Sequence, residues 1–206
     1  MEISVVTPED LDALVHLASD FWGRFYAGFD EAFVQVVSEC LVRDALTDED
    51  LALKVTQDGE VKGMLLATRK GHVARLDEWA AARSATMTTE EKKWFDLLLG
   101  YMKEADDKTF ALMDEDDVKL SLFVSAQKGG GKLLLESLAR IFREKRMKRM
   151  FLWTDDSCTH QYYPAHGFQL AASYADPRYS MLEEPYYTYI YWKGTGLLSD
   201  ERANVE

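Results

Sequence analysis

Apolar residues recur at intervals of three and four along much of the chain, which predicts several amphipathic helices. The predicted helices are 11–22, one that begins after Asp30, 74–107 and 132–146. Thr7 and Pro8 precede the first and favour a helix start. Thr88 and Glu91 form a capping box inside the third, so this stretch should contain a helix boundary.

Short apolar or alternating runs predict strands between these helices. The predicted strands are 2–6, 51–56, 61–67, 118–124, 150–154, 168–172 and 186–192. Asp58-Gly59 separates the second and third, which predicts an antiparallel hairpin. Strand 118–124, the helix after it and strand 150–154 form a βαβ unit, whose two strands should be parallel. The pattern therefore predicts a mixed sheet flanked by helices, an α/β (α+β) fold.

Length and composition suit one domain without repeats or linkers. The chain has 206 residues, of which 47% are hydrophobic, and we expect one domain over 1–195 and a polar tail over 196–206. No run of 18 apolar residues occurs and the first residues do not resemble a signal peptide, so no membrane association is expected. Cys40 and Cys158 fit neither a metal spacing nor a disulfide framework. These features predict a cytoplasmic protein without a metal.

The chain is acidic, with 24 Lys and Arg against 36 Asp and Glu and a net charge of −12. Such a chain gains no counterion release from nucleic acid, so DNA and RNA are excluded as expected partners. An acidic surface favours cationic small molecules or peptides. The same charge also increases solubility. Binding of cations and solubility both stay open as explanations of the acidic composition.

A glycine-rich turn joins strand 118–124 to the helix after it. It runs from Gln127 to Lys132 and contains three consecutive glycines flanked by lysines. Glycines are used where the backbone turns unusually or a ligand comes close, and a helix N-terminus favours an anion such as pyrophosphate. A flexible turn remains the alternative. The spacing matches neither a P-loop nor a dinucleotide-binding fingerprint.

The turn resembles that of the GNAT superfamily of acyl-CoA-dependent N-acetyltransferases. In that family a strand leads into a Gln/Arg-x-x-Gly-x-Gly/Ala turn and a helix with paired leucines. Placing the family's Gly-x-x-Leu-Leu on residues 131–135 puts Gly129 and Gly131 on the motif glycines, with Ala126 where Gln or Arg is usual. Starting at Gln127 shifts the register by one and puts a lysine on the second glycine.

A second block carries the same resemblance. The family commonly has Asn-x-x-Ala-x-x-x-Tyr-x-x-x-Gly-Phe after the next strand. Residues 156–168 match at Tyr163, Gly167 and Phe168, while Asp156 replaces the Asn and a threonine replaces the Ala. The order of elements also resembles the family over most of the chain, with residues 72–112 as an added helical pair.

The resemblance implies a GNAT-like fold: a mixed, mostly antiparallel sheet with one parallel βαβ unit. It implies transfer of an acetyl group from acetyl-CoA to a primary amine of a small molecule or peptide, and it leaves a homodimer open. Tyr163 is similar to the tyrosine near the CoA sulfur, where a phenol of pKa about 10 can protonate a thiolate of pKa about 8.5. The residues implied to bind the cofactor are Leu122, Phe123, Val124, Gln127, Lys128, Gly129, Gly130, Gly131, Lys132 and Asp156.

The sequence also allows other functions and other site residues. A non-catalytic acyl-CoA-binding module is the alternative function. The hypothesis of a nucleotide-binding regulator depends on the glycine turn alone. No general base is identified: His160 and His166 are expected to be structural, and Cys158 is expected to be a small buried residue rather than a nucleophile.

Charged segments outside these motifs are expected to be structural. The acidic turn 114–117 is predicted to be a solvated loop. The basic residues at the end of helix 132–146, including Lys148 and Arg149, are expected to balance the negative end of the helix dipole.

Overall fold

The computed structural model describes residues 1–26, 28–47, 50–74, 76–179 and 185–194. The chain forms two compact units. The first comprises Met1–Thr68, His72–Leu98 and Ser121–Leu138, and the second comprises Arg69–Gly71, Leu99–Leu120 and Ala139–Glu206. The single domain expected over 1–195 stays a prediction, and the tail 196–206 lies outside the described residues.

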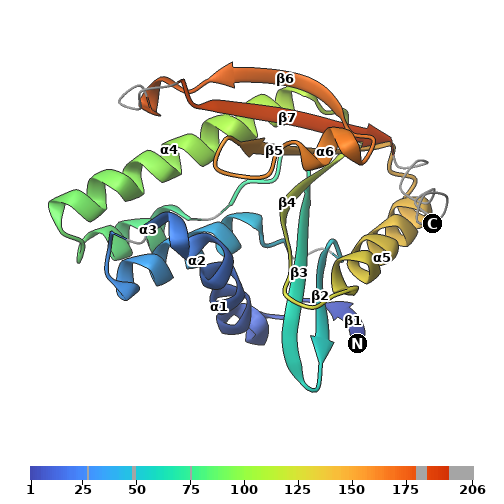
Figure 1. The fold of residues 1–206 in the computed structure, drawn as a ribbon, viewed down its shortest axis with the longest axis horizontal. Helices are drawn as coiled ribbons and strands as arrows, with labels where there is room; N and C mark the ends of the chain where they lie inside the picture. Colours follow the sequence, from blue (N-terminus) through green and yellow to red (C-terminus); the bar gives the residue numbers. More distant parts are fainter. Residues whose placement is uncertain (27, 48–49, 75, 180–184, 195–206) are drawn as a thin grey trace. The chain divides into compact units, whose positions relative to one another are not determined.

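The first unit is built on antiparallel strands (Figure 1). Its strands, in sheet order, are β1 (Glu2–Val5), β2 (Ala52–Gln57), β3 (Glu60–Arg69) and the end of β4 (Val118–Ser125). The predicted hairpin joins β2 to β3, and Asp58 and Gly59 both have positive φ, 54° and 83°. This left-handed pair matches the twist of the strands, so the hairpin prediction is confirmed.

The helices of the first unit include two that begin at caps predicted from the sequence. They are η1 (Pro8–Asp10), α1 (Leu11–Trp22), η2 (Gly23–Tyr26), α2 (Glu31–Ala45), α3 (Asp77–Ser84) and the start of α4 (Thr89–Leu112). The Asp30 carboxylate accepts a hydrogen bond from the Phe33 N–H at 2.8 Å, and Thr88 and Glu91 form the predicted capping box. The predicted helical stretch 74–107 is thus two helices.

Helices α1 and α2 lie side by side in Figure 1 and share one core with the strands. The core residues are Leu14, Val15, Leu17, Ala18, Val42, Ala45, Ala52, Met64, Leu66, Leu122 and Val124. Because neighbouring residues of a strand point to opposite faces, Leu122 and Val124 face this core and Phe123 does not.

The second unit contains the parallel pair and the C-terminal strands. Its elements are β5 (Arg149–Asp155), α6 (Tyr162–Ala165), β6 (Gln169–Ala175), η3 (Pro177–Tyr179) and β7 (Tyr187–Gly194). The start of β4 pairs in parallel with β5, Val118 with Met150, whereas β7 is antiparallel to both β5 and β6. The sheet order is β1-β2-β3-β4-β5-β7-β6, which confirms a mixed, mostly antiparallel sheet. Helix α5 (Gly130–Lys145) contributes to both units.

The C-terminal part of α4 packs on the strands of the second unit. Met113 shares a core cluster with Phe151 and Ile190. A buried lysine, Lys119, forms an ion pair with Asp106, which also accepts a hydrogen bond from the Trp153 indole at 2.6 Å. A buried charge needs such a partner, so these polar contacts fix α4 against β4 and β5.

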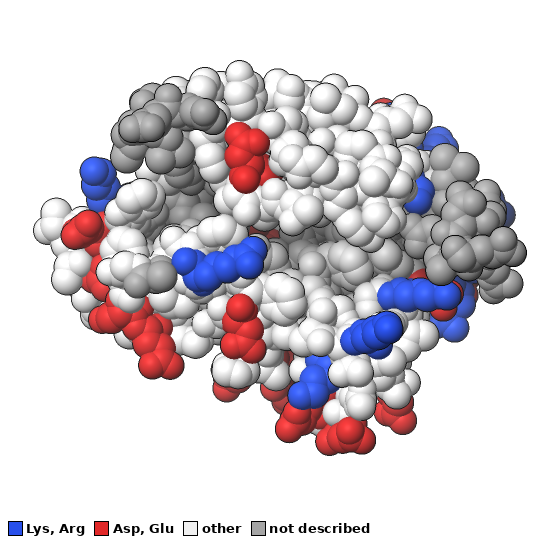
Figure 2. Space-filling view, in the orientation of Figure 1, with Lys and Arg blue, Asp and Glu red and all other residues white. Residues whose placement is uncertain are grey.

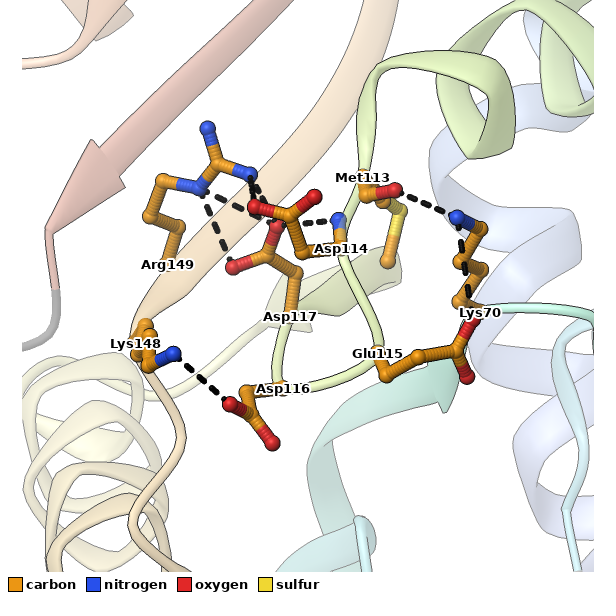
Figure 3. A network of polar contacts seen from close by, with 8 residues as sticks. All are labelled: Lys70, Met113, Asp114, Glu115, Asp116, Asp117, Lys148 and Arg149. Atoms are coloured by element: carbon orange, nitrogen blue, oxygen red, sulfur yellow. Dashed lines mark hydrogen bonds and ion pairs between the residues drawn. The ribbon is translucent and has the colours of Figure 1, made fainter.

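The acidic turn between α4 and β4 differs from the prediction (Figure 3). Asp117 is fully buried, and its carboxylate accepts hydrogen bonds from the Arg149 guanidinium and from the Asp114 N–H at 2.7 Å. Lys148 pairs with the exposed Asp116 at 2.8 Å. The expectation of a solvated loop is therefore wrong for Asp117, and the two basic residues bind the turn rather than a helix end.

From the sequence, Asp155, Asp156 and Ser157 are candidate caps for a short helix through Tyr163 that Pro164 and Gly167 end, whereas helix α6 has four residues and begins only at Tyr162. Asp155 and Ser157 do not cap it; instead the Asp155 carboxylate accepts hydrogen bonds from the N–H and hydroxyl of Ser157. Pro164 does not end the helix but lies in its first turn, where a proline is tolerated. Gly167, with φ of 78°, then ends the segment, as a glycine after a helix commonly does.

The surface carries both signs of charge despite the net charge of −12. Blue basic and red acidic side chains are both present on the face drawn in Figure 2.

No helix among the described residues is long and apolar enough to span a membrane, and these residues contain no cluster of three or more potential metal ligands. The cytoplasmic location and the homodimer stay predictions.

Candidate functional site

The glycine turn lies between β4 and α5 in the first unit. Backbone conformation favours glycine at one of its three glycine positions, and lack of space favours it at the other two. Gly129 has φ of 86°, which favours glycine. A Cβ on Gly130 would meet the Ser125 hydroxyl at 2.7 Å, and one on Gly131 would meet the Phe123 ring at 3.2 Å. The turn is therefore packed closely onto its own strand, which accounts for Gly130 and Gly131 without a ligand.

The start of α5 still offers groups that suit an anion. The Gly130 N–H donates to the Gln127 carbonyl at 3.0 Å and the Leu133 N–H to the Gly129 carbonyl at 3.2 Å. The N–H groups of the two residues between them have no carbonyl to reach within the helix. Together with the positive helix end, these groups favour a phosphate.

Two lysines flank this helix start. Lys128 and Lys132 are exposed, and no hydrogen bond or ion pair occupies either ammonium within the described part of the chain. The turn thus combines N–H groups, a helix dipole and two available positive charges. The residues present fit the pyrophosphate of an acyl-CoA.

The motif strand residues Leu122, Phe123 and Val124 lie directly before the turn. The side chains of Leu122 and Val124 are buried in the core of the first unit, and the Phe123 ring lies beneath Gly131. These side chains are committed to packing. The predicted cofactor contact of these three residues would therefore be made by their backbone, and it stays a prediction.

Tyr163 lies in the second unit, half-buried and packed against aromatic rings. Its ring stacks on Tyr191 at 5.6 Å and meets Phe168 edge-on at 5.4 Å. Burial, with Cys158 close by, raises its pKa to about 12, so the phenol keeps its proton at neutral pH. The Tyr163 hydroxyl has no hydrogen-bond partner among the described residues. A protonated donor without an internal acceptor is what a proton donor to a ligand requires.

Asp156 lies just after β5 and is held by β7. Its carboxylate accepts hydrogen bonds from the Tyr187 N–H at 2.6 Å and from the Tyr189 hydroxyl at 2.9 Å. About a third of its side chain, 32%, is exposed. The predicted cofactor contact of Asp156 stays a prediction, since these bonds show only what orients the carboxylate.

A buried carboxylate neighbours this segment. Asp155 accepts a hydrogen bond from the Tyr101 hydroxyl at 2.9 Å, and the same hydroxyl lies 3.0 Å from the Thr188 hydroxyl. Burial and Asp155 raise the pKa of Tyr101, which therefore stays protonated and donates to Asp155. This bond joins α4 to the start of the segment that carries Tyr163. No sequence signal indicated it, because the two residues are 54 positions apart.

The two histidines and the cysteine in the segment of Tyr163 pack against neighbouring side chains or are buried. His166 stacks on Tyr162 at 3.7 Å and bonds to its carbonyl, and His160 stacks on Tyr189 at 4.3 Å. Burial, and then Asp155, raise the pKa of the Cys158 thiol, which makes it a poor nucleophile at neutral pH. The structural interpretation of these side chains is supported.

The predicted site residues divide between the two units. The motif strand residues and the turn from Gln127 to Lys132 belong to the first unit, and Tyr163 and Asp156 to the second. In the second unit, Asp156 and Tyr163 contact different residues of β7, Tyr189 and Tyr191. Both tyrosines lie in the predicted strand 186–192.

Similar solved structures define the class of this fold. Among them are a PaiA N-acetyltransferase from Thermoplasma acidophilum in complex with coenzyme A (16% identity, TM-score 0.54) and arylalkylamine N-acetyltransferase 2 from Aedes aegypti (16%, 0.55). Each match covers 94% of this chain and 98% of the other. Ard1 from Thermoplasma volcanium matches at 14% identity and a TM-score of 0.51, over 94% of this chain and 96% of the other.

The first two neighbours are named as N-acetyltransferases, and another is described as a putative acetyltransferase of the GNAT family. The chain has the GNAT fold, as its sequence motifs predicted. No family model matches the sequence, and no curated protein matches it.

Proposed function

We propose that the chain is a GNAT-type acetyltransferase that moves an acetyl group from acetyl-CoA to a primary amine. The observation that carries the proposal is Tyr163: a half-buried, protonated phenol without a hydrogen-bond partner among the described residues, in the segment that resembles the family's Tyr-x-x-x-Gly-Phe. The fold and the glycine turn support it, because the same chain also offers an anion site at a helix start.

The chain's residues would have three roles. The N–H groups at the start of α5, with Lys128 and Lys132, would hold the pyrophosphate, and the backbone of residues 122–124 would bind the pantetheine arm. When bound, acetyl-CoA supplies the thioester. The Tyr163 hydroxyl would donate its proton to the departing sulfur. In the net reaction a C–N bond replaces the C–S bond, and the proton lost by the amine balances the one gained by the thiol.

Calorimetric titration with acetyl-CoA tests the donor first, with ATP and NAD as controls. Saturable one-site binding of acetyl-CoA alone is expected, followed by product formation in a screen of amine acceptors. Binding without turnover of any amine would favour the alternative, a non-catalytic acyl-CoA-binding module. No binding of acetyl-CoA or other acyl-CoAs would mean that the glycine turn is only a turn.

Tyr163→Phe tests the proposed acid. Removing the hydroxyl should lower kcat by about 100-fold, since general acid catalysis contributes on this order, while calorimetric affinity for acetyl-CoA stays nearly unchanged. The matched control is Tyr162→Phe, the same change one residue earlier, on a ring that is 41% exposed. Equal rates in wild type and Tyr163→Phe would remove Tyr163 as the acid.

A further inference from the structure

Helix α6, which carries Tyr163, buries little surface of its own. It is four residues long, and none of its residues is fully buried. An element with little buried apolar surface moves easily unless other bonds fix it. The position of the Tyr163 hydroxyl therefore depends on what holds the turn that follows the helix, at residues 166–168.

This turn is bonded directly to Tyr163. The N–H groups of His166 and Phe168 both donate to the Tyr163 carbonyl at 3.0 Å. The Phe168 ring also meets the Tyr163 ring edge-on, with the ring centroids 5.4 Å apart. A displacement of the turn would therefore move both the backbone and the ring of Tyr163.

A buried lysine on β7 holds the turn. Lys193 is only 5% exposed, and its ammonium donates to the His166 carbonyl at 2.9 Å. The same ammonium lies 5.6 Å from the centroid of the Phe168 ring, close enough for a cation–π attraction. A hydrogen bond from a charged donor is about twice as strong as one between neutral groups. Lys193 thus binds the turn at both residues that hold Tyr163.

The same strand supports Tyr163 at a second point. Tyr191 precedes Lys193 by two residues and therefore lies on the same face of β7, where its ring stacks on Tyr163 at 5.6 Å. Burying an ammonium group costs free energy that an apolar side chain would not cost. The charge of Lys193 therefore needs a reason, and its contacts with the turn provide one.

We propose that Lys193 is a positioning residue for the proposed acid: by holding His166 and Phe168, it sets the place of the Tyr163 hydroxyl. This inference rests on the proposed function. Lys193 acts only through the turn, so it affects the rate of transfer and not the binding of acetyl-CoA.

Lys193→Met tests the proposal, because it keeps an apolar stem and removes the ammonium. With an amine that the wild type acetylates, kcat should fall about tenfold, since a small misplacement of a catalytic group is costly, while the KM for acetyl-CoA stays unchanged. Lys193→Arg retains a charged donor and should recover most of the loss. The matched control is Lys119→Met, which removes another buried ammonium, one that pairs with Asp106 on α4; it should lower stability but not the kcat of the folded protein.

A double-mutant cycle distinguishes positioning from a general structural effect. When Tyr163 is already replaced by phenylalanine, Lys193→Met should lower kcat no further, because the hydroxyl that it positions is gone. If the losses of the two substitutions multiply, Lys193 affects the rate by another route and the inference is overturned. An unchanged kcat in Lys193→Met overturns it as well.

Aromatic NMR spectra give a result that does not require turnover. The ring signals of Tyr163, identified by their loss in Tyr163→Phe, should move in Lys193→Met and stay in place in Lys119→Met. This measurement still decides if no amine is acetylated, so failure of the proposed function is separate from failure of the inference. If Lys193→Met does not fold, Lys193→Gln, which is neutral and one atom shorter, replaces it. Unmoved Tyr163 signals in the folded Lys193 variant overturn the inference.

Discussion

The Tyr163 phenol illustrates how the surroundings of one residue set its chemistry. Phe168 and Tyr191 cover its ring, and burial raises its pKa from 10.0 to about 12. A phenol that stays protonated across the neutral range can act as a hydrogen donor throughout that range. The sequence motif indicated Tyr163. The burial that raises its pKa depends on packing against Tyr191, which is 28 positions further along the chain.

The same shift makes the stability of the protein sensitive to alkaline pH. Between pH 10 and 12 the unfolded chain loses the Tyr163 proton that the folded chain retains, so the free energy of unfolding should fall as pH rises in this window. Urea denaturation between about pH 9 and about pH 11 measures it. Tyr163→Phe should make the decline shallower, whereas Tyr162→Phe should not. If the free energy of unfolding falls equally steeply with pH in wild type and Tyr163→Phe, the raised pKa of Tyr163 is contradicted.

At the scale of elements, the acidic turn 114–117 between α4 and β4 is held by ion pairs, next to the apolar contact of the buried Met113. Arg149 at the start of β5 reaches both Asp114 and Asp117, and Lys148 reaches Asp116 (Figure 3). Only Asp117 is buried. Its pairing with Arg149 therefore fixes the connection at the place where β4 and β5 begin their parallel pairing.

Asp117→Ala should be strongly destabilising, by about 3 kcal/mol, because it leaves the Arg149 guanidinium without its buried partner. The free energy of unfolding from urea denaturation measures the effect. Asp116→Ala is the matched control: it removes a neighbouring carboxylate whose ion pair is exposed, and little change is expected. Equal effects of the two substitutions would mean that burial of Asp117 is not what stabilises the turn.

At the scale of the whole molecule, the net charge of −12 adds a long-range attraction for cations to any local site. Raising the ionic strength from about 0.01 M to about 0.15 M shortens the Debye length from about 30 Å to about 8 Å. With 1,5-diaminopentane as acceptor, the Michaelis constant should therefore rise more steeply with salt than it does with pentylamine, which carries one positive charge fewer. Steady-state kinetics in sodium chloride measure this, with sucrose as a non-ionic control. Equal salt dependence for the two amines would argue against charge as the basis of acceptor preference.

Much of the fold could be predicted because its signals are local. Asp58-Gly59 adopts positive φ at both residues, Asp30 caps α2, and Thr88 pairs with Glu91 within one turn. Each of these contacts joins residues at most three positions apart. The glycine turn and Tyr163 were likewise indicated by short motifs.

The features that the sequence did not predict join residues far apart. Tyr101 bonds to Asp155 across 54 positions, Arg149 to Asp117 across 32, and Tyr189 to Asp156 across 33. Such pairs form only when helices and strands pack, and no local pattern of charge distinguishes the buried Asp117 from the exposed Asp116 beside it.

By itself, then, the sequence determined the elements, the order of the motifs and the candidate acid, since backbone geometry and caps act within a few residues. Only the tertiary structure decided which carboxylates are buried and which side chain orients each of them. Burial and desolvation depend on every element packed around a group, and that information is distributed over the whole chain.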